Sequence, residues 1–248
     1  FTLPGSENGY HYIFTIDPAG LKDVRLWIYA FGQAFFSLSI AGNGTVIYGS
    51  YLSDSEDIPG SARNVAFFDT CAALLAGMVV IPAVFAFGLD AASGPPLMFI
   101  TLPVVFQKMP FGAVFAVIFF IAVLFAAITS LMNLFETPIE ALQEQFHLSR
   151  GMAVGIIAVI SAAVGIFIES GDAVGMWMDA VSIYIIPLGA LLAGIMFFWV
   201  CPKGYARGQV EEGREKPLGK WFEPVTKYVF VGITLVVYVL GIFFGGIG

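Results

Sequence analysis

Polar residues stand at three places inside the longest apolar runs of the chain, where each costs free energy unless it is paired. The first run holds Ser37, Ser39 and the sequence Gly42-Asn43-Gly44. The second holds the carboxylate of Asp69, and the third holds Ala126-Ala127-Ile128-Thr129-Ser130. Carbonyl, hydroxyl and carboxylate oxygen atoms of this kind are suited to binding a hard cation.

The third set has the spacing of a helix face. Thr129 and Ser130 follow Ala126 by three and four residues, so the Ala126 carbonyl and both hydroxyls share one face. These oxygens could form part of the shell of a monovalent cation. Alternatively, the hydroxyls bond back to the carbonyl four residues earlier, or they join neighbouring helices.

Asp69 also has two interpretations. An ionised carboxylate in a membrane span is expected to face the bundle interior and to mark an ion or proton pathway. Near the end of a span, it would instead reach the headgroups. In the first case, Ser37 on the neighbouring span could give its hydroxyl to the same ion.

The sequence Gly42-Asn43-Gly44 predicts a break in its helix, because glycine costs about 1 kcal/mol in a helix interior. In lipid, the freed backbone groups must find partners in protein or in a water-filled cavity. Half-helix ends near the bilayer midplane can hold the charged groups of a substrate and its coupling ions. The alternative is a glycine kink that allows close helix packing.

Composition indicates what kind of protein holds these residues. A hydrophobic content of 58%, a charged content of 12% and a mean hydropathy of +0.88 lie outside the range of soluble globular proteins. We predict an all-α, polytopic transmembrane bundle, a single transmembrane domain with spans at 26–52, 65–89, 111–141, 151–169, 174–200 and 223–246. The predicted connections are an extracellular loop at 1–25, a capping loop at 90–110 and a cytoplasmic loop at 201–222.

Lysine and arginine placement orients the chain. With the basic loop 201–222 inside the cell, eight basic residues lie on the cytoplasmic side and three on the other. A multi-pass protein of the cell inner (plasma) membrane is therefore expected. The chain begins at Phe1, with no initiator methionine and no signal-peptide pattern, so we expect it to be the C-terminal part of a longer protein.

Four segments of the chain resemble the neurotransmitter:sodium symporter family. WIYAFGQAFFSLSIAGNGTVIYGSYL is similar to its sixth span, and DTCAALLAGMVVIPAVFAFG to its seventh. SGPPLMFITLPVVFQKMPFG resembles the loop that caps its vestibule, and FFIAVLFAAITSLMNLFETPIEAL its eighth span. The resemblance runs in order over essentially the whole chain. It implies the second part of a leucine-transporter-type inverted-repeat fold, from about the sixth to the eleventh span, with a discontinuous first helix.

The resemblance also implies roles for individual residues. The second sodium site would use the Ala126 carbonyl, Thr129 and Ser130, and the first would use Ser37 and Asp69, where many members have Asn. The substrate site would be formed by Phe36, Ser37, Ser39, Gly42, Ser130 and Leu134. Gln33 matches a possible chloride-site position, and Asp179 a possible extracellular gate.

The function that the resemblance implies is sodium-coupled amino-acid symport by alternating access, with Na+ as the coupled ion and Cl− left open. Gly42 stands where the bacterial leucine transporter has a bulky aromatic residue, so we expect a large apolar or aromatic substrate. The expected partners are the amino acid, the lipid bilayer and spans one to five of the same full-length chain, with no nucleic acid.

Three other functions compete with this one. A non-transporting receptor or scaffold would share the fold. An ion channel would need a continuous polar pore, and the fourth and sixth predicted spans have almost no polar face. An intramembrane enzyme is disfavoured, because the HExxH pattern is absent and Asp69 has no second acid at a matching depth. We therefore expect no enzymatic activity.

Overall fold

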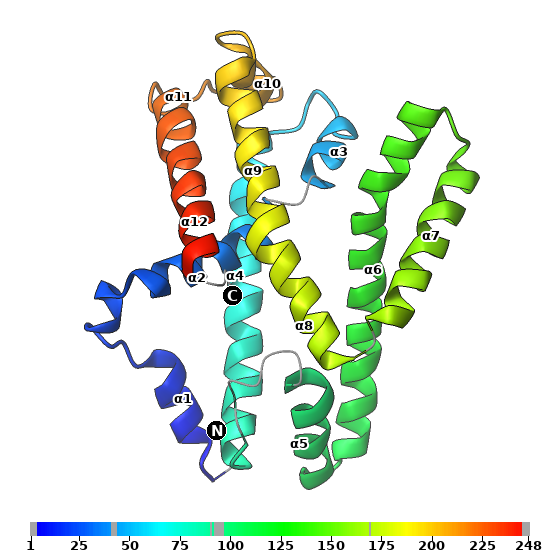
Figure 1. The fold of residues 1–248 in the computed structure, drawn as a ribbon. Coiled ribbons are helices and arrows are strands. Elements are labelled where there is room, and N and C mark those ends of the chain that lie inside the picture. Colours follow the sequence, from blue (N-terminus) through cyan, green and yellow to red (C-terminus); the bar gives the residue numbers. More distant parts are fainter. Residues whose placement is uncertain (1–3, 41–43, 90, 92–96, 169, 245–248) are drawn as a thin grey trace. The chain divides into compact units, whose positions relative to one another are not determined.

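The computed structural model of the 248-residue chain describes residues 4–40, 44–89, 91, 97–168 and 170–244. Throughout these residues the regular structure is helical (Figure 1). The chain divides into two compact units, and the divisions fall inside helices α4 (Ile58–Ala86) and α6 (Gly112–Phe146). The first unit holds Phe1–Pro18 and Phe68–Met132, and the second holds Ala19–Phe67 and Asn133–Gly248.

In the first unit, the short helix α1 (Ser6–Phe14) crosses α4 at very close range. A Cβ atom added to Gly9 would lie 2.4 Å from the Cα atom of Pro82, so a larger residue would push the two backbones apart. The segment 1–25, which we expected to form a loop, therefore carries a helix that packs on α4.

The same unit contains a helical cap between α4 and α6. Element η2 (Leu97–Thr101) leads into α5 (Leu102–Lys108), and Val84, Leu102 and Val105 form the buried cluster that joins α5 to α4. The chain then reverses into α6 through a tight turn, where a Cβ atom on Gly112 would lie 1.6 Å from the Phe106 carbonyl oxygen. The predicted capping loop at 90–110 thus contains the short helix α5.

The second unit begins with α2 (Val24–Ser37) and α3 (Gly44–Ser50) and includes α7 (Arg150–Phe167). Two long continuous helical segments of this unit, called the first and the second rod below, each consist of several helical elements. The first rod comprises α8 (Gly171–Asp179), η3 (Ala180–Ile185), α9 (Ile186–Ile195) and η4 (Met196–Val200). The second comprises α11 (Phe222–Pro224), η5 (Val225–Phe230) and α12 (Val231–Phe244). Pro187 lacks the N–H that would bond to the Ile183 carbonyl, which explains why the wide turns of η3 precede it.

The core of the second unit forms where α2, α9 and α12 meet. Each helix contributes one buried residue, namely Phe35, Ala190 and Val237. The Phe35 ring also meets the edge of the Phe230 ring, with 6.4 Å between the ring centroids. This packing fixes the C-terminal end of α2, where the helix break was predicted.

Five helical stretches among the described residues are long and apolar enough to cross a membrane, namely Ile58–Ala86, Gly112–Phe146, Arg150–Phe167, Ala173–Val200 and Phe222–Phe244. The predicted span at 26–52 is discontinuous, as expected, because it is divided between α2 and α3. The most apolar part of α6 is 0% buried within the described structure. An apolar surface of that length requires lipid or further protein to cover it. The chain is therefore a multi-pass membrane protein.

Candidate ion and substrate site

Helix α2 ends in a hydrogen-bonded cap centred on Ser39. The Ile40 amide donates to the Phe35 carbonyl and the Ser39 amide donates to the Phe36 carbonyl, both at 3.1 Å. Ser39 has a φ of 52°, the left-handed conformation that glycine usually supplies at this position. Ile40 packs against the core cluster that contains Phe35, which is the apolar contact typical of this motif.

The break thus begins at Ser39, three residues before the predicted glycine. Gly42 and Asn43 lie outside the described residues, and helical structure resumes at Gly44. The cap occupies the carbonyl groups of Phe35 and Phe36. The backbone at Ser39 and Ile40 therefore turns away from the axis of α2, and a charged group at this helix end would contact that turned backbone.

One face of α2 carries several of the predicted substrate and ion residues. Gln33, Phe36 and Ser37 stand at positions i, i+3 and i+4, and all three are exposed within their unit. Phe36 is 55% exposed, whereas its neighbour Phe35 is 7% exposed and lies in the core. The core face and the candidate site face of this helix are thus separate.

The predicted oxygen cluster on α6 is partly assembled within the first unit. The Thr129 hydroxyl lies 2.9 Å from the Ala126 carbonyl oxygen and 3.1 Å from that of Phe125. A hydroxyl has one proton, so it can donate to one carbonyl while its lone pairs and the other carbonyl remain available to a cation. The back-bonding alternative and the cation shell are therefore compatible here. Ser130 follows on the same exposed helix.

Asp69 lies deeper in its helix than the sequence indicated. Helix α4 begins at Ile58, seven residues before the predicted span, which places Asp69 about 17 Å along the helix at 1.5 Å per residue. Its side chain is half-buried. Asp69 and Thr129 belong to the first unit and Ser37 to the second, so the convergence of the three stays a prediction.

Sequence reasoning missed a polar network in the second unit, at the end of α6. The Tyr51 hydroxyl lies 2.9 Å from Glu136 Oε1 and 2.5 Å from Glu140 Oε1. Arg150 donates to both carboxylate oxygens of Glu136 at 2.9 Å. Tyr48 completes the set with a 2.5 Å bond to Asn133.

The spacing of these residues is only a partial signal of the network. Tyr48 and Tyr51 are three residues apart, and Glu136 and Glu140 are four apart, so each pair shares a helix face, but spacing does not show that the two faces meet. Glu136 is only 9% exposed, because the tyrosine and the arginine cover it.

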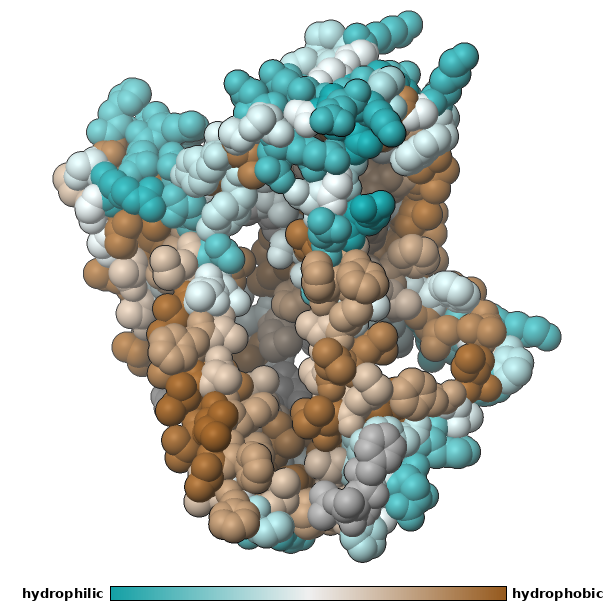
Figure 2. Space-filling model, turned by 180° about the vertical axis from the view of Figure 1, so that it is seen from behind, coloured by the Kyte–Doolittle hydropathy of each residue, from teal (hydrophilic) through white to brown (hydrophobic). Residues whose placement is uncertain are grey.

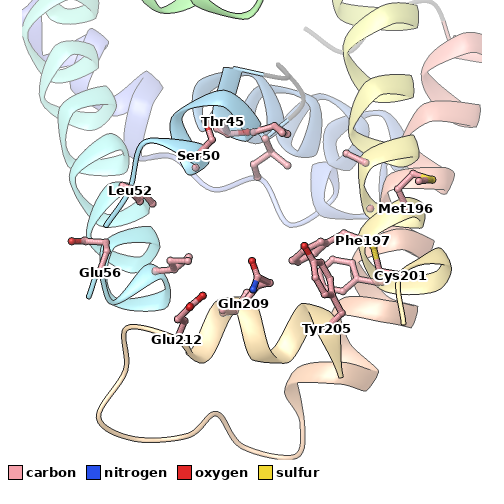
Figure 3. A pocket seen from close by; sticks show the side chains of 18 of the residues that line it. Thr45, Ser50, Leu52, Glu56, Met196, Phe197, Cys201, Tyr205, Gln209 and Glu212 are labelled. Atoms are coloured by element: carbon pink, nitrogen blue, oxygen red, sulfur yellow. The ribbon is translucent and has the colours of Figure 1, made fainter. Parts of the chain in front are cut away.

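Two loops of the second unit are held together by an ion pair and a close backbone contact. Arg214 pairs with Asp57 at 2.7 Å, and a Cβ atom on Gly213 would lie 2.1 Å from the Glu56 carbonyl oxygen. Glu56 and Gly213 also line a cavity of about 900 Å³ (Figure 3). Thr45 and Ser50 of α3 lie on one side of it, and Gln209 of α10 (Tyr205–Glu211) points toward them.

A model of the sodium:neurotransmitter symporter family matches residues 1–244. The chain belongs to this family. The resemblance found in the sequence is therefore confirmed, and the helix that breaks at Ser39 is part of a symporter-family fold.

One solved structure and two curated proteins show how similar this symporter-family chain is to known proteins. The crystal structure of MhsT in complex with L-phenylalanine superposes with a TM-score of 0.84 at 29% identity, covering 97% of this chain and 57% of that one. An uncharacterized sodium-dependent transporter of Haemophilus influenzae is 37% identical over 62% of this chain and 33% of its own length. Another, from Methanocaldococcus jannaschii, is 29% identical over 90% of this chain and 48% of its own length. The chain thus spans about half the length of these relatives, or less.

The remaining predicted residues of the symporter site are placed as follows. Leu134 lies on α6 in the second unit and is 67% exposed. Asp179 is the last residue of α8, and its side chain lies outside the described part of the structure. Their roles, like those of the residues on α2 and α4, stay predictions.

Proposed function

We propose that the full-length protein imports an amino acid together with Na+ across the plasma (inner) membrane by alternating access. The observation that carries this proposal is the Ala126–Thr129 oxygen pair on a membrane-length helix whose apolar surface is exposed. Family membership supports it, as do the names of relatives from a bacterium and an archaeon, both called sodium-dependent transporters.

In the proposed mechanism, ion and substrate share polar groups. One Na+ binds between Ser37 and Asp69, and a second binds at the Ala126 carbonyl, Thr129 and Ser130. These ions neutralise the carboxylate, and the substrate amine then binds beside the cap at Ser39. Since each ligand completes the site of the other, their affinities are coupled reciprocally. Each Na+ that moves inward across 100 mV releases about 2.3 kcal/mol.

We propose a large apolar or aromatic amino acid as the substrate. Gly42 stands where the bacterial leucine transporter has a bulky aromatic residue, so the side-chain subsite should be larger by most of the volume of a ring. The structural relative MhsT was crystallised with L-phenylalanine. Phe36, exposed on α2, would close over the substrate from outside, and Leu134 would form an apolar wall. Spans one to five of the full-length protein would supply the other half of the pocket.

Chloride coupling is a separate question. Gln33 stands at the position near the chloride site of chloride-dependent members, and it is exposed on the same face of α2 as Ser37. Ala73 stands where chloride-independent members carry an acid, and the requirement for Cl− is left open. Uptake measured with gluconate in place of chloride tests this point.

Competition binding tests the substrate class. The purified full-length protein is mixed with radiolabelled phenylalanine in NaCl, and unlabelled tryptophan, tyrosine, leucine, alanine and glycine are titrated in. We expect the aromatic amino acids and leucine to compete at lower concentration than alanine and glycine. If alanine or glycine competes best, the argument from Gly42 is wrong. Uptake into proteoliposomes under a sodium gradient separates a transporter from a receptor, because a receptor binds without accumulation.

A further inference from the structure

A second cavity, distant in sequence from the ion site, lies between the ends of the two long rods of the second unit. It has a volume of about 420 Å³ and is lined by residues of η4, α11, η5 and the loop that follows Val200. Three cations, Lys203, Arg207 and Lys227, line it, against one carboxylate, Glu223. The cavity therefore attracts anions.

Arg207 holds the wall of this cavity in place. Its guanidinium donates to Glu211 at 3.0 Å and to the carbonyl groups of Leu218 and Gly219 at 2.9 and 3.0 Å. Its Nε lies 3.5 Å from the Glu223 carboxylate. The positive charge of Arg207 is thus largely compensated, and its donors are used to fold the loop.

Lys203 and Lys227 carry the uncompensated charge. Within the described residues, neither ammonium group lies within 4.0 Å of a carboxylate. Lys227 stands over the ring of Trp199, with 4.5 Å from Nζ to the ring centroid, and Trp199 Nε1 donates to the Lys227 carbonyl at 3.0 Å. The ring therefore positions this ammonium without neutralising its charge.

An apolar groove of about 500 Å³ lies next to the basic cavity, and Tyr228 lines both. The groove follows the second rod from Tyr228 to Leu240. Its near part, from Tyr228 to Val236, is about 12 Å long at 1.5 Å per residue and lies in the cytoplasmic half of the predicted span 223–246. The wall from α2 begins at Val24 in the outer half, because Arg25 stands over the ring of Phe244.

The cavity also lies at the depth where lipid headgroups are expected. It opens where the membrane-length helices Ala173–Val200 and Phe222–Phe244 end, with Trp199 and Tyr228 in the position of an interfacial aromatic belt. Figure 2 shows hydrophilic side chains gathered at the top of the view, over the loop that carries α10, above hydrophobic helix surfaces. By the distribution of lysine and arginine, this loop faces the cytoplasm, where basic pockets between spans bind anionic headgroups.

We propose that the basic cavity and the apolar groove together form a binding site for one anionic phospholipid of the cytoplasmic leaflet. Lys203 and Lys227 contact the headgroup phosphate, and an acyl chain lies in the groove beside Gly232 and Val236. This proposal is independent of the transport function, because none of its residues belongs to the ion or substrate site.

Native mass spectrometry of the purified full-length protein tests the proposal, with phosphatidylglycerol as the probe and phosphatidylcholine as the neutral comparison. We expect one phosphatidylglycerol to be retained, and K203Q/K227Q to weaken its binding about 30-fold, the effect of two lysines at a membrane surface. The matched control, K216Q/K220Q, removes the same charge from exposed residues of the same loop that do not line the cavity. An equal loss in both pairs, or equal binding of phosphatidylcholine, would overturn the proposal.

A further variant separates a lipid from a free anion. Nothing lies within 4 Å of a Cβ atom built on Gly232, so a side chain there enters the open groove, and Gly232→Phe can fill it. It should weaken phosphatidylglycerol binding about tenfold and leave the lysines intact. If Gly232→Phe has no effect, and millimolar inorganic phosphate displaces the lipid completely, the cavity is a free-phosphate site and the lipid assignment is wrong. An unchanged elution volume in gel filtration shows that each variant is folded.

Discussion

The amide of Ser39 donates to the carbonyl oxygen of Phe36 at 3.1 Å, with Ser39 in the left-handed conformation. That conformation costs a residue with a Cβ atom about 1–2 kcal/mol of free energy, and glycine avoids this cost. The helix break therefore depends on a strained serine whose backbone lies beside the proposed site of the substrate amine. This residue has to meet a demand of stability and a demand of binding.

Substitutions at Ser39 should separate those demands. Ser39→Gly relieves the left-handed strain and should leave the melting temperature unchanged or raise it, whereas Ser39→Val, with its β-branch, should lower it. Ser39→Val should also disturb the backbone beside the substrate amine, so it should bind substrate more weakly than Ser39→Gly does. Thermal-shift and substrate-binding measurements on the full-length protein check this. Equal melting temperatures for Gly and Val would contradict the proposed strain.

The ion pair of Arg150 and Glu136 should contribute measurably to stability. The side chain of Arg150 is 58% exposed, so screening by water limits what the pair contributes. Arg150→Gln should destabilise the protein. Arg150→Lys should retain only part of the stability that Arg150→Gln loses, because lysine cannot make the two parallel hydrogen bonds to Glu136.

A double-mutant cycle isolates this pair. The combination of Arg150→Gln with Glu136→Gln should be less harmful than the sum of the two single changes, because no unpaired carboxylate is then left buried. The control is Arg63→Gln, which removes an exposed arginine from α4. Strict additivity, measured by denaturation of the full-length protein, would show that the pair contributes nothing.

Close backbone contact, more than charge, should hold the two loops at Gly213. A Cβ atom there would meet the Glu56 carbonyl oxygen at 2.1 Å, so Gly213→Ala must push the loops apart. The Asp57–Arg214 pair is 50% and 22% exposed and should contribute 1 kcal/mol or less. We therefore expect Gly213→Ala to lower the melting temperature more than Arg214→Gln does.

Gly208 provides the control for that substitution. It lies in α10, and nothing lies within 4 Å of its Cβ position, so Gly208→Ala should be neutral or slightly stabilising. If the two alanine variants melt at the same temperature, the loops are not held by this contact.

The sequence predicted well those features that depend on local hydrophobicity and helix spacing. The apolar runs predicted α4, α6 and α7 to within a few residues at most ends, and the Ala126–Thr129 spacing predicted two oxygens on one helix face. The position of the break was less accurate. The glycines at 42 and 44 indicated a break, but α2 already ends near Ser39, because Ile40 and Phe35 pack together in the core.

Features that depend on tertiary contact could not be predicted. Glu136 and Arg150 were not predicted as a pair, because no local pattern shows that they and Tyr51 lie side by side. Similarly, nothing in the sequence near Gly9 indicates that Pro82 lies against it, because the two positions are far apart in the chain. The polar network and the Gly9–Pro82 contact both depend on packing between distant parts of the chain.

Sodium dependence of substrate binding tests the central claim most directly. Phenylalanine binding to the full-length protein is measured across a range of NaCl concentrations, with choline keeping the ionic strength constant, in wild type, Thr129→Ser and Thr129→Val. Valine has nearly the shape of threonine but no hydroxyl, and the loss of one ligand to a charged group costs about 1.5–3 kcal/mol. We predict that wild type and Thr129→Ser bind only with sodium, and that Thr129→Val requires at least tenfold more of it. Equal binding in choline and in sodium, for wild type and variants alike, would contradict the account.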